Sequence, residues 1–89
     1  MKRKWYVRVR RGEIDVDGFV HADSPTEAFL LFVRRNKVWP RRAYVRLEHF
    51  PGGYTYHAYP VWKVGNGVSL GDRWVARIIS EEEFNRLYG

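Results

Sequence analysis

The sequence predicts one α+β domain over residues 1–89, with an antiparallel or mixed sheet of about five to six strands, one main helix and a short C-terminal helix. Three observations predict it. Short segments with alternating apolar and polar residues recur along the chain, as in half-buried strands. Ser24 and Ser80 are each followed three residues later by Glu, the pattern that begins a helix. At 89 residues the chain can bury one small core. The expected order is β-β-α-β-β-β-β-α.

Residues 5–11 and 14–22 predict a β-hairpin. Both segments alternate with a period of two, and Gly12 separates them. Gly18 interrupts the second segment, where we expect a bulge or a turn. The apolar residues in phase are Trp5, Val7, Val9, Ile14, Val16, Val20 and Ala22.

The strongest local signal begins a helix over residues 25–36. Ser24 is a favoured N-cap, a proline follows at the first helical position, and Glu27 completes a capping box. We expect Asn36 to adopt the left-handed conformation that ends many helices. Residues 28–33 are apolar on nearly every side, so either the second half of the chain or a partner is expected to cover the helix.

Further strands and a short helix follow. The strand at 73–79 is apolar on both faces, which predicts a central position. After Ser80, apolar residues at i, i+3 and i+4 predict a short helix that packs on the body. An economical arrangement places strand 43–50 beside the first strand, with the main helix across one face. The expected later strands span residues 43–50, 54–59, 61–64, 68–70 and 73–79, with an Asn-Gly turn between the third and fourth of these.

Positive charge is concentrated in the first half of the chain. The protein has a net charge of +6 and a pI near 10. Residues 1–46 hold 12 Lys/Arg and 5 Asp/Glu, whereas residues 47–89 hold 4 and 5. A basic protein favours anionic partners, so we expect nucleic acid or an acidic protein surface. The longest apolar run has six residues, so no membrane partner is expected.

Arginine and tyrosine alternate on the predicted strands of the basic half. If the helix covers the Trp5 face, the opposite face combines groups that pair with phosphate and groups that stack on unpaired bases. Alternatively, the arginines lie on a solvated face and the tyrosines fill cross-strand pairs, or later strands cover this face. The candidate nucleic-acid-binding residues are Lys2, Arg3, Lys4, Tyr6, Arg8, Arg10, Arg34, Arg35, Lys37, Arg41, Arg42, Tyr44 and Arg46.

The sequence predicts no enzyme and no cofactor. Without cysteine there is no disulfide, thiolate metal site or cysteine nucleophile. The three histidines, His21, His49 and His57, have no carboxylate at ligand spacing, so no metal site is expected. Gly65–Gly71 lacks the spacing and the lysine of a phosphate-binding loop. No signal peptide is expected, because Trp5–Arg8 stands where an apolar stretch would follow the basic start; this predicts a cytoplasmic protein, or one of the host cytoplasm if viral.

Composition leaves the source and one rival function open. Arginine outnumbers lysine 12 to 4 and glutamine is absent, as in a thermophile or in a GC-rich genome. Aromatic residues make up 17% of the chain, so some are expected at the surface, as in protein–protein hot spots. The leading hypothesis is a small non-catalytic binder of RNA or single strands. The rival is a protein-binding module, such as a viral inhibitor of a host nucleic-acid machine or a subunit of a ribonucleoprotein assembly. The oligomeric state is not predicted.

Residues 5–47 have the predicted order strand, strand, helix, basic turn and strand. The residues that carry a resemblance in this stretch are Ala22, Ser24, Ala28, Arg41–Arg42 and Val45–Leu47. In this order and at these positions the chain resembles small archaeal ribosomal proteins of the LX type. Residues 51–89 have no counterpart in that resemblance, which therefore covers half of the chain.

Overall fold

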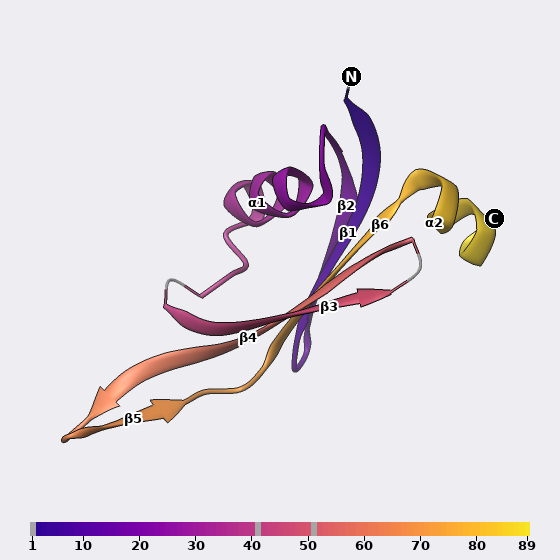
Figure 1. Ribbon diagram of the computed structural model, residues 1–89. Helices are drawn as coiled ribbons and strands as arrows, with labels where there is room; N and C mark the ends of the chain where they lie inside the picture. The colour runs from indigo at the N-terminus through magenta and orange to yellow at the C-terminus, as the bar shows by residue number, and fades with distance from the viewer. Residues whose placement is uncertain (1, 41, 51) are drawn as a thin grey trace.

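The computed structural model describes residues 2–40, 42–50 and 52–89, which form six strands and two helices (Figure 1). This is the predicted α+β fold, in the predicted order. The elements are β1 (Arg3–Arg11), β2 (Ile14–Ala22), α1 (Pro25–Asn36), β3 (Ala43–Phe50), β4 (Gly53–Val64), β5 (Gly67–Leu70), β6 (Trp74–Ser80) and α2 (Glu81–Tyr88).

The sheet is antiparallel, with strand order β2-β1-β6-β4-β3, and β5 pairs with the far half of β4. β6 is central, as its two apolar faces predict. The arrangement with β3 beside β1 is wrong, because β6 and β4 lie between them. β3 and β4 are neighbours in sequence and pair as a hairpin, and β6 then joins this hairpin to β1.

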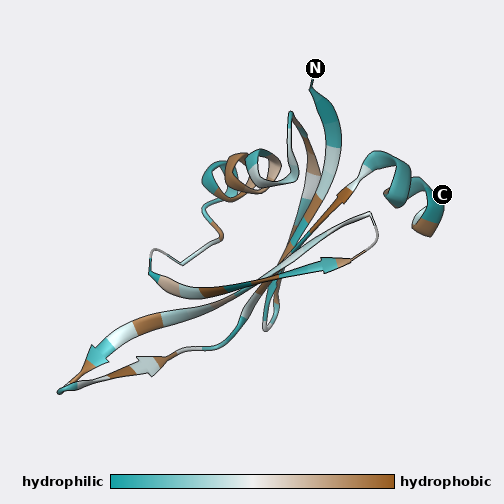
Figure 2. Cartoon of the chain, in the orientation of Figure 1, coloured by the Kyte–Doolittle hydropathy of each residue, from teal (hydrophilic) through white to brown (hydrophobic). Residues whose placement is uncertain are grey.

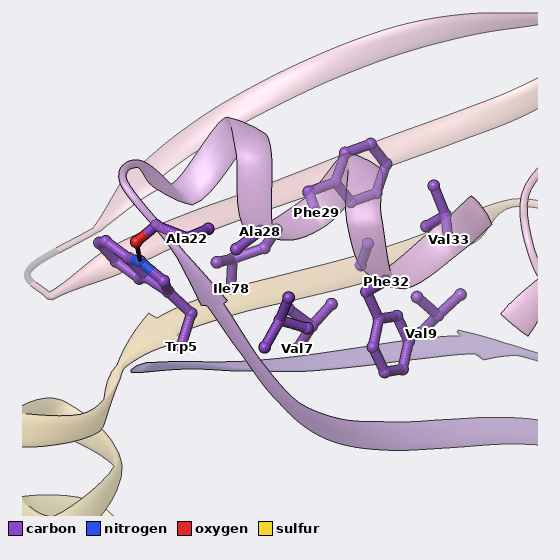
Figure 3. Packing of buried hydrophobic residues seen from close by; sticks show 11 residues of the cluster. Trp5, Val7, Val9, Ala22, Ala28, Phe29, Phe32, Val33 and Ile78 are labelled. Carbon is purple, nitrogen blue, oxygen red and sulfur yellow. Dashed lines mark hydrogen bonds between the residues drawn. The ribbon is translucent and has the colours of Figure 1, made fainter. Parts of the chain in front are cut away.

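The core lies between α1 and one face of the sheet (Figure 3). Val7, Val9 and Ile78 are fully buried beneath the helix, and Phe32 is only 1% exposed. Trp5 closes one end of this core, where its indole Nε1 donates to the carbonyl oxygen of Ala22 at 3.1 Å. The buried residues of α1 recur at helical spacing and therefore form one stripe that faces the sheet. In β1 the side chains alternate, so every second residue points to the sheet face away from α1.

Gly18 forms no bulge, contrary to the sequence-based expectation. The register of β1 and β2 is continuous, with Gly18 opposite Val7. A Cβ built at Gly18 would lie 3.4 Å from Cε2 of Phe32. The glycine therefore leaves room for the Phe32 ring within a regular strand.

The N-terminus of α1 is capped as predicted, and its C-terminus differs by one residue. Ser24 Oγ accepts from the backbone N–H of Glu27 at 3.1 Å, and the Glu27 carboxylate accepts from the N–H of Asp23 at 3.2 Å. The left-handed residue is Lys37, with φ of 54°, and not Asn36. Asn36 is the last helical residue, and its side-chain amide donates to the carbonyl oxygen of Phe32 at 2.9 Å.

The second half of the chain covers only one flank of α1. Phe29 stacks on Tyr56 of β4 with ring centroids 4.4 Å apart, and Trp39 meets Phe29 edge-on. Leu30 and Leu31 remain exposed. Of the two covers expected for the apolar helix, the second half of the chain therefore supplies one on this flank only, and the expectation of a partner stays a prediction.

β4 continues past Pro60 and pairs with β5, so it is longer than predicted. Residues 61–70, here called the arm, project from the sheet, and the molecule measures 48 × 23 × 22 Å (Figure 1). Apolar residues recur along the arm (Figure 2). Four of these side chains are exposed: Trp62, Val64, Val68 and Leu70.

Across residues 2–40, 42–50 and 52–89, neither helix has the length and apolar character needed to cross a membrane.

Candidate nucleic-acid interface

Arginines lie in rows on the sheet face that points away from α1. Because neighbouring strands pair in a fixed register, residues paired across β1, β6, β4 and β3 share one face. We call the two rows together the arginine face. The first row contains Arg8, Arg77, Thr55 and Glu48, and the second contains Arg10, Val75, His57 and Arg46.

Two tyrosines continue this face beyond the second row. Tyr59 of β4 is paired with Tyr44 of β3, and their ring centroids are 6.5 Å apart. Tyr44 is 61% exposed, so its ring is available for stacking on a base. Tyr44 and Arg46 share a face with Arg8, as the alternation predicts, although two strands separate them.

α2 covers the other end of the face. The Phe84 ring centroid lies 4.7 Å from that of Tyr6 and 5.0 Å from that of Phe19. Tyr6 is only 7% exposed, and its hydroxyl donates to Asp17 Oδ2 at 2.7 Å. This packing leaves Tyr6 without a surface for a stacked base. Lys4 lies at the same end, with its Nζ 3.4 Å from Glu81 Oε2.

The buried position of Tyr6 has a measurable consequence at alkaline pH. Burial, assisted by the hydrogen bond to Asp17, raises the pKa of Tyr6 to about 12. We expect stability to fall as pH rises above 10, because the unfolded chain then releases a proton that the folded chain retains. An absorbance titration should contain a late tyrosine component that Tyr6→Phe removes. An unchanged late component in that variant would contradict this assignment.

Ion pairs neutralise part of the arginine face. Arg8 donates to both carboxylate oxygens of Asp15, at 2.9 and 2.6 Å, and this pairing lowers the pKa of that carboxyl. Arg46 Nη2 lies 2.9 Å from Glu48 Oε1. Arg10 is more weakly paired, with its Nε 4.0 Å from Asp15 Oδ2. Arg8 and Arg46 are two of the candidate residues. Their guanidinium groups are therefore already paired with carboxylates of the protein itself.

Arg77 is the freest cation in the two rows. Its guanidinium lies over the ring of Phe50, 4.9 Å from the centroid, and it has no carboxylate partner among the residues that the structure describes. Near one end of the face, Arg10, Arg11 and Arg73 line a hollow of about 420 Å³. An anion therefore has the easiest access to this face at Arg77 and at the hollow lined by Arg10, Arg11 and Arg73.

The remaining candidate residues lie elsewhere. Arg34, Arg35 and Lys37 are on α1 or its cap, on the opposite side of the sheet, and Arg35 Nη2 donates to the carbonyl oxygen of Phe19 at 3.3 Å. Lys2 and Arg42 are exposed just before β1 and β3. Arg3 lines a hollow together with Lys4, Glu81 and Glu82, where carboxylates offset its charge. Arg41 lies outside the described residues.

Four residues of the site were missed in the sequence: Arg73, Arg77, Tyr59 and His57. Arg77 belongs to a strand whose apolar composition predicts a buried position, and this hides its place on an open face. The usable signal was the period of two, which puts Arg73 and Arg77 in phase with Val75. His57 has no carboxylate at ligand spacing in the sequence, and the nearby Glu48 reaches it only through the pairing of β3 with β4.

Within the described residues, no group of three or more His, Asp or Glu side chains could hold a metal ion. Comparisons with protein family models, with curated proteins and with solved structures gave no match.

Proposed function

We propose that the protein binds single-stranded nucleic acid, RNA in preference, through the arginine face and without catalysis. The observation that carries the proposal is that Arg10, Arg73 and Arg77 lie on the same sheet face as the exposed ring of Tyr44, which stands at the edge strand β3. Single strands are favoured over duplex because stacking requires unpaired bases. Such a protein would act in the cytoplasm, or in the host cytoplasm if it is viral.

The proposed mechanism is phosphate neutralisation with stacking. Arginine N–H groups donate charge-assisted hydrogen bonds to phosphate oxygens, and each stacked base contributes roughly 1–3 kcal/mol. The carboxylates of Asp15 and Glu48 hold Arg8 and Arg46 but also repel phosphate, which limits affinity. The chain has no Gln and three Asn, so readout of base edges should be minor.

The test is fluorescence anisotropy of single-stranded RNA, single-stranded DNA and duplex DNA over a range of salt. With about three phosphate contacts on a single strand, affinity should fall roughly 20-fold between about 50 and 200 mM salt. Single strands should bind more tightly than duplex DNA of the same length. No binding to any of the three at the lowest salt would overturn the proposal.

A second candidate function, binding of a protein, is supported by the arm. The arm is a two-stranded ribbon, a structure that is only marginally stable by itself. It carries an apolar surface formed by the exposed side chains of Trp62, Val64, Val68 and Leu70. Exposed aromatic and aliphatic residues of this kind anchor protein interfaces. This candidate becomes the leading one if the protein binds no nucleic acid.

A further inference from the structure

His57 lies in the middle of the arginine face and is only 8% exposed. It lines a groove of about 300 Å³ on that face. The groove has room for a small oxyanion. Its other lining residues include Arg8, Arg10, Glu48, Thr55, Arg77 and Tyr88.

Both ring nitrogens of His57 are buried. Neither Nδ1 nor Nε2 has a hydrogen-bond partner in the described part of the chain. Glu48 Oε2 is 3.4 Å from Nε2, close enough for an ion pair when the ring is protonated but outside hydrogen-bond geometry. A buried polar group without a partner costs about 1–3 kcal/mol, and an absent ligand is one explanation for such a group.

The groups around His57 come from every element that borders the groove. β1 supplies Tyr6, Arg8 and Arg10, β6 supplies Arg77, and α2 supplies Tyr88. On β3, Arg46 is paired directly with His57 and Glu48 is in the adjacent row. Thr55 and Tyr59 flank it along β4. Arg8, Arg10, Arg46 and Arg77 surround the ring, Glu48 lies beside it, and Asp15 pairs with Arg8 and Arg10. An oxyanion bound in the groove would favour the protonated imidazole.

We propose that this groove is an oxyanion site that takes one phosphate group of the bound strand, and that His57 takes up a proton from solvent as the phosphate enters. Arg77 and Arg10 supply charge-assisted hydrogen bonds, and Thr55 supplies a neutral donor. The protonated imidazole donates to the phosphate oxygen, which replaces the Glu48 carboxylate beside Nε2. Glu48 keeps its pairing with Arg46. That the phosphate belongs to a nucleic acid strand rests on the proposed function, whereas the oxyanion site does not.

Proton uptake makes binding depend on pH. Because the anion favours the protonated imidazole, affinity should rise as pH falls, by up to about tenfold per pH unit where one proton is taken up. We expect about a five- to tenfold gain between about pH 7.5 and 6. Sulfate and an oligonucleotide without terminal phosphate are the probes, since neither changes its own charge over this range.

The experiment follows the His57 ring protons by NMR during a sulfate titration, and oligonucleotide anisotropy at both pH values. His57→Asn should flatten the pH dependence to below about twofold, by removing the linked proton. His21→Asn, an exposed histidine on β2, should leave it unchanged. Glu48→Gln keeps the imidazole and removes the competing carboxylate, so it should tighten sulfate binding, which tests the site even if His57→Asn fails to fold.

The outcomes separate the site from the proposed function. Sulfate binding that shifts the His57 protons, without any oligonucleotide binding, would support the site and overturn the function. Oligonucleotide binding that His57→Asn leaves equally dependent on pH, without a sulfate response at His57, would overturn the site and leave the function standing.

Discussion

Replacement of Phe32 by alanine should lower the free energy of unfolding by about 3–5 kcal/mol, measured by denaturant titration. The ring is 1% exposed and lies between α1 and the β1–β2 hairpin, against the space that Gly18 leaves open. Truncation would leave a cavity at the centre of the core. The free energy of unfolding of a small domain is about 5–15 kcal/mol in total, so this substitution would remove much of the stability.

Leu31→Ala is the matched control. Leu31 is the preceding residue of the same helix and is exposed, so its truncation removes few contacts and should cost about 1 kcal/mol or less. An equal loss of unfolding free energy in the two variants would show that α1 does not pack on the sheet through the side that carries Phe32.

Local signals in the sequence predicted the elements well. Ser24 and the capping box located the start of α1, and the observed helix has the predicted bounds. Alternation located β3 at residues 43–50. These features depend on residues that are near one another in the chain, where capping bonds and the two periodicities act.

The order of strands could not be read in the same way. That β6 lies between β1 and β4 depends on pairing between residues such as Tyr6 and Ile79, more than 70 residues apart in sequence. The two apolar faces of β6 predicted a central position but not its neighbours. As a result, β3 was placed beside β1, and Arg77 was not recognised as part of the open face.

Burial of Tyr6 and pairing of Arg8 were beyond sequence reasoning for a related physical reason. The period of two correctly assigned both to the face away from α1. Whether a side chain there is open depends on what else reaches it, and α2 brings Phe84 from the end of the chain onto Tyr6. Arg8 meets Asp15 across the β1–β2 hairpin because of side-chain reach and not because the two residues are directly paired.

Charge reversal at Arg10 and Arg77 should reduce affinity for single-stranded RNA by roughly 100-fold or more. A hydrogen bond to a charged group contributes about 1.5–3 kcal/mol, so loss of two corresponds to about 3–6 kcal/mol, and each 1.4 kcal/mol is tenfold. Arg10→Glu with Arg77→Glu removes two of the least neutralised cations of the arginine face and adds repulsion toward phosphate. Anisotropy at fixed salt measures the loss. The dependence on salt should also become shallower, because fewer counterions are released on binding.

Net charge alone could lower affinity, so the control makes the same change in charge elsewhere. Arg34→Glu with Lys37→Glu alters two exposed cations at the C-terminal end of α1, on the opposite side of the sheet from the arginine face. At about 0.15 M salt the Debye length is about 8 Å, so these distant charges should reduce affinity less than about fivefold. A similar loss in both double variants would mean that binding follows the overall field of the protein. A loss confined to the Arg10 and Arg77 variant would mean that phosphate contacts this face, because of the four substituted residues only these two lie on it.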